Sequence, residues 1–190
     1  LAKVGFAWQR ELWNAGVSVT TPSLGVLGSG SAGYTRSASG VDSTGAARPT
    51  SPILITATAE DLDATYRTSW AVGTGGSVRR GATRVYVSAE WFAPVDKADV
   101  LALPATFGED VRLTQEARSV LNAGLGIEQV LSEDVSVYGA FHTDFSSSLG
   151  GSPTNVAVSD WNLYHLSGGT SFRILDNRFT LGATAFALWT

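Results

Sequence analysis

The stretch that decides the fold is Trp70-Ala-Val-Gly-Thr-Gly-Gly-Ser-Val-Arg-Arg-Gly-Ala-Thr-Arg-Val-Tyr-Val-Ser-Ala-Glu-Trp91. Apolar and small residues alternate along both arms of this stretch, which is the period of a half-buried β-strand. Arg80-Gly81 lies between the arms, and glycine is a residue that tight turns favour. The stretch therefore predicts a β-hairpin in which Trp70 lies opposite Trp91.

The same pattern occurs three more times along the chain, so that hairpins are predicted near residues 1–20, 66–92, 117–146 and 160–190. In each hairpin, the apolar residues of both arms share one face, as correct pairing requires. The expected cross-strand pairs are Trp8 with Trp13, Leu121 with Phe145, and Phe172 with Phe179. Long connections rich in Gly, Ser, Pro and Thr separate the hairpins at 21–65, 93–116 and 147–159. The first of these has room for two further strands, at 24–38 and 53–59.

Composition excludes several classes of function. The chain has 190 residues, of which 16% are charged, and a net charge of -4, which is the wrong sign for a surface that binds nucleic acid. The absence of Cys removes disulfides, thiol catalysis and Cys-ligated zinc. No window approaches the ~20 apolar residues of a membrane helix, and no signal peptide is visible. A chain of this kind that meets a membrane does so with strands.

Two architectures fit eight or more alternating strands: a soluble sandwich or barrel, and a transmembrane barrel with its apolar face outward. The polar face is rich in Gly, Ser, Ala and Asn, with isolated ionisable groups, which is typical of a narrow, wet barrel interior. The candidate lumen-lining residues are Arg67, Arg84, Glu90, Glu128, His142, Asp144, His165 and Arg173.

Tryptophan placement favours the transmembrane barrel, since Trp gathers at the two interfaces of a bilayer. Trp8 and Trp13 flank a short turn, whereas Trp70, Trp91 and Trp189 lie about ten residues from the nearest turn, a distance that spans the hydrocarbon core. We therefore expect an all-β, antiparallel up-and-down β-barrel in the bacterial outer membrane, with lipid as its partner. Both termini fall at the long-loop end, so we expect this segment of about eight to ten strands to belong to a larger barrel.

Three pieces of the sequence resemble the FadL-like outer-membrane transporters of long-chain fatty acids and other hydrophobic compounds. They are Trp70 to Trp91, Leu121-Asn-Ala-Gly-Leu-Gly-Ile-Glu128, and the stretch from His165-Leu-Ser-Gly-Gly-Thr to Leu181-Gly-Ala183. The resemblance implies a monomeric barrel of about fourteen strands that passes hydrophobic solutes by passive diffusion, without cofactor or enzymatic step. We transfer no binding residue from the family.

Other motifs carry weaker hypotheses. Gly28-Ser-Gly-Ser-Ala-Gly33 fits the dinucleotide fingerprint, but no helical pattern follows it, so a loop or strand is expected. His142, Asp144 and His165, with Ser136 or Ser167, could form a catalytic or metal cluster. We expect instead that the histidines line the lumen and form hydrogen bonds to neighbouring strands.

Two loop features complete the analysis. Clustered carboxylates at Asp42, Glu60, Asp61 and Asp63 could bind Ca²⁺, but we expect them to be solvated charges in a surface loop, since their spacing matches no calcium loop. Leu101, Leu103 and Phe107 could meet a hydrophobic solute or fold back onto the rim. The predicted function is passive transport of hydrophobic small molecules. A general porin or other outer-membrane barrel is one alternative, and a soluble β-sandwich binding module is another.

Overall fold

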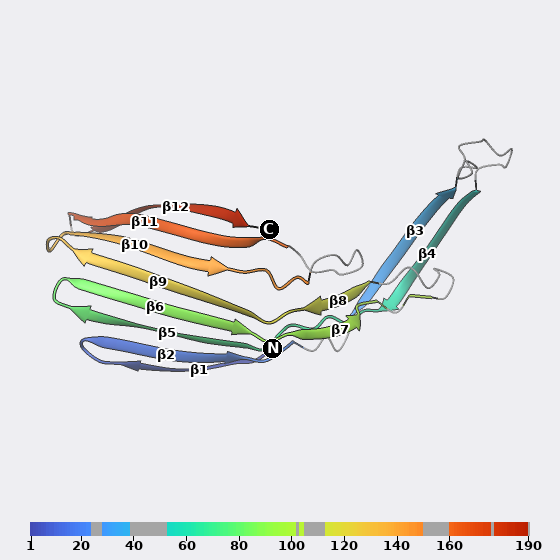
Figure 1. Ribbon diagram of the computed structural model, residues 1–190, viewed down its shortest axis with the longest axis horizontal. Coiled ribbons are helices and arrows are strands. Elements are labelled where there is room, and N and C mark those ends of the chain that lie inside the picture. The colour runs from blue at the N-terminus through green and yellow to red at the C-terminus, as the bar shows by residue number, and fades with distance from the viewer. Residues whose placement is uncertain are drawn as a thin grey trace.

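The computed structural model describes residues 1–23, 28–38, 53–101, 103–104, 113–149, 160–175 and 177–189. Within these residues, eight strands form one antiparallel sheet in the order β1-β2-β5-β6-β9-β10-β11-β12 (Figure 1). Their bounds are β1 Lys3–Gln9, β2 Trp13–Thr20, β5 Ala71–Arg80, β6 Thr83–Phe92, β9 Val120–Val130, β10 Val135–Asp144, β11 Asn162–Ile174 and β12 Asn177–Trp189. The predicted all-β, antiparallel fold class is confirmed. Among the described residues, β1 and β12 each pair with one neighbour, so the sheet is open between them.

The two ends of the sheet differ in the length of their connections. The four short links between paired strands lie at one end, which we call the turn end; the long connections lie at the other, the loop end (Figure 1). There the hairpin of β3 (Ser29–Ala38) and β4 (Ile53–Asp63) projects away from the sheet as an arm. These strands fall in the two segments where the sequence left room for them.

A third strand pair lies at the loop end, where the sequence indicated only a long loop at 93–116. It consists of β7 (Val95–Asp99) and β8 (Thr114–Ala117). The loop prediction was wrong here because β7 is five residues long, carries three charges and contains a register shift between Val95 and Ala98. Such a strand has no apolar alternation from which it could be recognised.

The register confirms some predicted pairs and corrects others. Phe172 pairs with Phe179. His142 pairs with Gly124, and continuing this register places Leu121 opposite Phe145, as expected. Trp8 and Trp91, however, pair with Ala15 and Val72, so both predicted Trp–Trp pairs were wrong by two residues.

The cause of the error is that both turns lie one residue further along the chain than expected, which changes the register by two residues. Arg80 pairs with Thr83, which leaves a two-residue turn whose first residue, Gly81, has a φ of 61°. Glycine adopts this left-handed conformation without steric cost. A shift of two residues preserves the side on which each side chain lies, so the predicted faces are unaffected.

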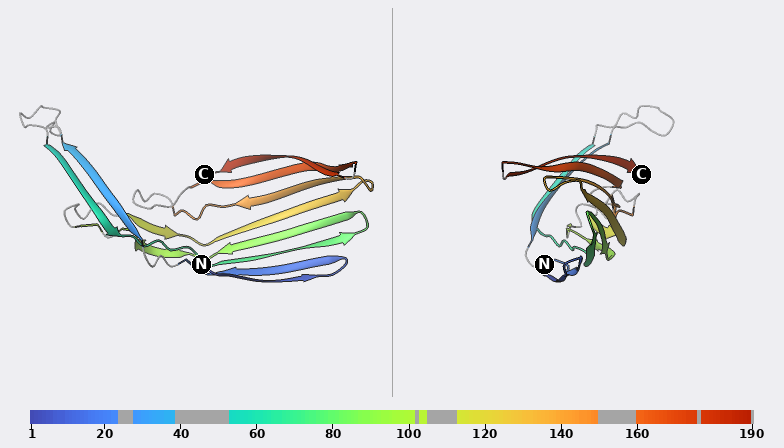
Figure 2. Two further views of the ribbon diagram at one scale, coloured as in Figure 1. Left: turned by 180° about the vertical axis from the view of Figure 1, so that it is seen from behind. Right: turned by 90° about the vertical axis from the view of Figure 1, so that its left-hand side faces the viewer.

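On the interior strand β9 the two faces of the sheet differ in exposure, and the apolar face is the more exposed one, whereas on the edge strands β1 and β12 both faces are exposed. On β9, the apolar Leu121, Leu125 and Ile127 are 58%, 57% and 51% exposed, whereas the residues between them are half-buried. The sheet is curved when viewed along its strands (Figure 2). We therefore call the polar, more shielded side the inner face and the apolar side the outer face.

Within the described part of the chain, few side chains are buried. The buried residues of the sheet are Ala71, Ser77, Val120 and Ser136, and all four belong to the inner face. The remaining buried residues, Leu62, Val95, Thr114 and Gln115, belong to the strand pairs at the loop end. The large aliphatic and aromatic side chains of the sheet thus form no core between layers.

Candidate functional site

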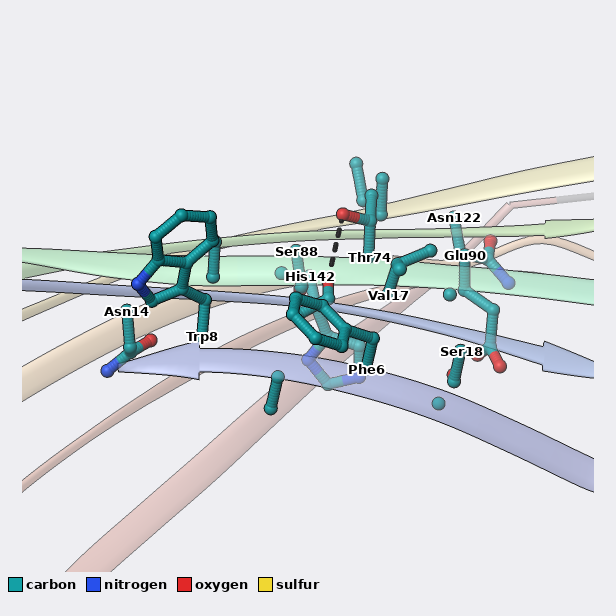
Figure 3. Close-up of a pocket in the computed structure, with 18 of the residues that line it drawn as sticks. Phe6, Trp8, Asn14, Val17, Ser18, Thr74, Ser88, Glu90, Asn122 and His142 are labelled. Carbon is teal, nitrogen blue, oxygen red and sulfur yellow. Dashed lines mark hydrogen bonds between the residues drawn. The ribbon is translucent and has the colours of Figure 1, made fainter. Parts of the chain in front are cut away.

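A trough with a cavity volume of about 970 Å³ crosses the sheet from β1 to β10 (Figure 3). Its floor is made of small residues because Gly16, Gly75 and Ser88 are successive neighbours across β2, β5 and β6. Toward the loop end, Ser18 and Glu90 flank Gly73. A β-carbon built on Gly73 would lie 3.2 Å from Ser18 Oγ and 3.9 Å from Glu90 Oε1. The trough is therefore wide at its glycines and polar beside Ser18 and Glu90.

Two histidines stack on the inner face beyond this floor. His142 on β10 pairs directly with His165 on β11, with ring centroids 4.1 Å apart and planes 3° from parallel. Phe186 on β12 pairs with His165, and their rings are 6.4 Å apart. The Nε2 atom of His165 is buried and has no hydrogen-bond partner among the described residues.

This arrangement does not form the catalytic or metal cluster that the sequence allowed. Stacked rings do not direct their nitrogens to one point, and no group of three metal-ligating side chains occurs among the described residues. Ser136 lies six residues from His142 along β10, a separation of about 20 Å. Ser167 donates a hydrogen bond to the Ala140 carbonyl instead. Neither serine is placed as a nucleophile beside the histidines.

A second hollow of about 770 Å³ lies nearer the turn end, and its lining combines apolar side chains with hydroxyl and charged groups. Here the Tyr86 hydroxyl donates a hydrogen bond of 2.7 Å to Glu128 Oε2. Arg84 pairs across the sheet with Glu128 and, on its other side, with Arg79. The inner face at this end thus combines one carboxylate with two neighbouring arginines.

Tyr138 covers a gap in the same hollow. It pairs with Gly169, which in turn pairs with Gly182, and a β-carbon built on either glycine would collide with the Tyr138 ring. The ring therefore lies flat across the glycines of two neighbouring strands, a device known to stabilise glycine in sheets. Tyr138 fixes the shape of the hollow.

Most of the predicted lumen-lining residues lie on the inner face. Seven of them lie there, on β6 and β9 to β11: Arg84, Glu90, Glu128, His142, Asp144, His165 and Arg173. Arg67 does not, because it lies in the connection before β5, where its backbone amide donates a 3.0 Å hydrogen bond to Gln115 Oε1. The prediction omitted Tyr86, Tyr138 and Arg178, although their alternation with apolar neighbours placed all three on this face.

The five tryptophans predicted at membrane interfaces are all well exposed. Trp8, Trp13, Trp70, Trp91 and Trp189 are 48%, 41%, 48%, 41% and 70% exposed. Trp8 and Trp13 contact each other at the turn end, with ring centroids 5.8 Å apart. The other three lie at the loop end, where Trp91 donates a hydrogen bond from its indole nitrogen to Ser119 Oγ at 2.7 Å.

The remaining motifs belong to the loop end. Gly28 to Gly33 enters β3, so a strand and not a phosphate-binding helix follows it. Leu101 contacts the position that a β-carbon on Gly30 would occupy, so this leucine folds back onto the arm. Glu60, Asp61 and Asp63 lie on β4. Asp42 and Phe107 lie outside the described residues.

No family model matches the chain, and no curated protein or solved structure shows significant similarity to it. In the described residues, no helix is long and apolar enough to span a membrane.

Proposed function

We propose that the chain forms part of the wall of an outer-membrane β-barrel that passes small hydrophobic molecules by passive diffusion. The observation that carries this proposal is the exposure of the apolar face over eight paired strands. On β12, every outer-face residue from Phe179 to Trp189 is apolar or alanine, and Phe179, Leu181 and Trp189 are 49%, 69% and 70% exposed. A face of this kind favours contact with lipid.

The height of the apolar band supports a bilayer. Ten residue steps separate Phe179 from Trp189, which is about 33 Å along a strand, and a tilt of about 40° reduces this to a height of about 25 Å. This is the height of the apolar band on outer-membrane barrels. On β6 the corresponding run, Val85 to Trp91, covers six steps or about 20 Å along the strand, which the same tilt reduces to about 15 Å, so the band is shorter there.

A soluble β-sandwich would cover the apolar face with a second sheet. The two other strand pairs that the structure describes lie at the loop end and leave the outer face open. Lipid is therefore the better candidate for covering it.

The hydrophobic nature of the solute is supported by the inner face at the loop end. Ala71, Phe92 and Val120 are neighbours in one row across β5, β6 and β9, and Leu163 pairs with Leu188 on β11 and β12. The row of Leu163 and Leu188 continues through Asp144 on β10, so two separate apolar groups lie on the inner face near the end from which a solute would arrive. Toward the turn end the inner face carries Tyr86, Arg84 and Glu128.

That change of lining is also the observation that favours the alternative, a general porin. Rings of charged side chains select polar solutes in such channels. Arg84, Glu128 and Arg173 on the inner face would contribute to such a ring. The two candidates therefore differ in which solute class crosses faster.

An uptake experiment tests the proposal in cells that express the full reading frame. We expect the protein in the outer-membrane fraction, and faster uptake of labelled long-chain fatty acid than of a small sugar. Phe186→Asn should lower fatty-acid uptake about three- to tenfold, because this exposed phenyl ring lies on the inner face of β12.

Phe179→Asn changes the same residue type on the outer face of the same strand and should leave uptake per inserted molecule unchanged. Equal uptake of both solute classes would exclude the hydrophobic transporter and leave the barrel. Recovery of the protein in the soluble fraction would exclude both.

A further inference from the structure

Two arginines and two tryptophans gather on the outer face at the turn end. Arg10 lies directly across from Trp13, whose carbonyl accepts the Arg10 backbone N–H at 2.8 Å. The guanidinium carbon of Arg10 lies 5.5 Å from the centre of the Trp8 ring, and Trp8 contacts Trp13. Arg80 is the fourth member, two residues beyond Val78, which pairs with Trp13. We call these four residues the turn-end cluster.

The geometry places Trp13 between the two arginines. Residues directly opposite in a sheet have β-carbons about 5 Å apart, and diagonal neighbours lie about 7 to 8 Å apart. Arg10 lies directly opposite Trp13, and Arg80 is its diagonal neighbour. Both side chains are long enough to reach a single group held over the indole ring.

The positive charge of the cluster is not neutralised by the described part of the protein. No carboxylate forms an ion pair or hydrogen bond with Arg10 or Arg80 among the described residues, and the contact of the Arg10 guanidinium is with the Trp8 ring. The acidic residue of the same turn is Glu11, which follows Arg10 and lies opposite Arg80 when the β2–β5 register is continued, but no ion pair joins it to either arginine in the described part of the chain. Glu133 and Asp134 belong to the turn between β9 and β10, beyond β5 and β6 in the sheet.

The cluster also marks the level at which the outer face changes from apolar to polar. Val78 and Val85 pair with each other, and the next outer-face pair toward the turn end is Arg80 with Thr83. Thr83 in turn donates a 2.6 Å hydrogen bond to Gln129. In a barrel whose apolar band lies in hydrocarbon, this level is that of the lipid phosphates, where Trp and Arg are both favourable.

We infer that the turn-end cluster binds the phosphate of an anionic glycerophospholipid, such as phosphatidylglycerol, in the leaflet at the turn end. This inference rests on the proposed insertion of the outer face in a bilayer. The guanidinium groups supply paired donors to the phosphate oxygens. Trp8 and Trp13 supply the apolar wall beside the glycerol. An anionic lipid is preferred because its phosphate charge is not offset by an ammonium group, which Arg10 and Arg80 would repel.

The test measures which lipid the protein retains. The full-length protein is reconstituted in vesicles of equal parts phosphatidylethanolamine and phosphatidylglycerol, extracted in mild detergent, and its bound lipids are quantified by native mass spectrometry. We expect a retained excess of phosphatidylglycerol that falls about fivefold in Arg10→Gln and again in Arg80→Gln, the effect of one cation near an anionic surface. Arg10→Lys with Arg80→Lys should keep part of the preference, since the charge remains.

Arg79→Gln is the matched control, because Arg79 is adjacent in sequence but belongs to the inner face with Arg84. It should leave lipid retention unchanged. An unaltered preference in the Arg10→Gln, Arg80→Gln double variant would overturn the inference, as would an equal loss in Arg79→Gln. Displacement of the lipid by 50 mM inorganic phosphate, which adds an ionic strength of about 0.1 M and so stays near the physiological value, would overturn the inference by showing that a free anion is the ligand.

The outcomes also separate this inference from the transport proposal. A retained preference for phosphatidylglycerol in a protein that shows no solute uptake would refute transport and leave the lipid site. Failure of the protein to enter vesicles at all would refute both.

Discussion

A charge placed on the outer face should be far more harmful than the same charge placed one residue further along the chain. Val87 is 55% exposed on the outer face of β6, next to Leu125 on β9. Ser88, its neighbour in sequence, is on the inner face and lines the trough. Val87→Arg and Ser88→Arg therefore add the same group to opposite sides of one strand.

The expected magnitudes differ because the two faces would meet different solvents in the proposed barrel. Arginine on the lipid face costs about 2 to 4 kcal/mol near the middle of a bilayer, whereas lumen positions accept charge. Val87 lies within the apolar run of β6, with Val85 on its turn side and Ala89 and Trp91 on its loop side. We expect Val87→Arg to shift the folding equilibrium about 30- to 1000-fold toward the unfolded state. Ser88→Arg should change it less than about tenfold.

Folding into lipid vesicles along a urea gradient measures both free energies of unfolding. The wild type and the two variants are compared in the same vesicles, and the apparent slope with urea checks that the transition remains two-state. Equal stability of Val87→Arg and the wild type would refute the assignment of the outer face to lipid. A larger loss in Ser88→Arg would mean that the inner face is the packed one.

Three further variants test one turn and the inner-face hollow by the same assay. Leu175 has a φ of 48° and is 89% exposed. Leu175→Gly should raise the free energy of unfolding by about 1 kcal/mol, because glycine adopts this left-handed conformation without strain. An unchanged or lower free energy of unfolding would mean that the turn relaxes and holds no strain. Gly182→Ala should lower the free energy of unfolding by about 1 to 3 kcal/mol, because the new methyl group meets the Tyr138 ring. In the Gly182→Ala, Tyr138→Ala double variant, the losses of the two single variants should not add. Strictly additive losses would show that the two residues do not interact.

The strands and their faces could be predicted from sequence because alternation is a local property. Trp8 and Trp13 illustrate its limit. Their common face was predicted correctly, but their register was not, since moving the turn by one residue changes the register by two and leaves every side chain on the same side. The shared face of His142 and His165 was likewise readable. Their direct pairing was not, because it depends on the register between β10 and β11 across a connection of 17 residues, 145–161.

Arg67 and β7 show what alternation cannot supply. Arg67 was assigned to a strand because Tyr66, Thr68 and Trp70 continue the pattern of β5, yet the strand begins at Ala71. The side chain of Gln115, on β8, binds the Arg67 backbone instead. This contact joins residues 48 positions apart, so no local pattern could indicate it.

Curvature connects the composition of the two faces with the proposed function. Side chains crowd together on the inner face of a curved sheet and spread apart on its outer face. The inner face of a closed barrel therefore either carries small residues and stays open, or carries large residues that fill a core. A soluble barrel fills that core with large apolar side chains. In this chain the central inner-face row contains Gly16, Gly75 and Ser88, which line a trough of about 970 Å³, while Leu125 and Val87 lie on the outer face. The same residues that open the interior thus leave the apolar mass outside, where lipid can cover it but a protein core cannot.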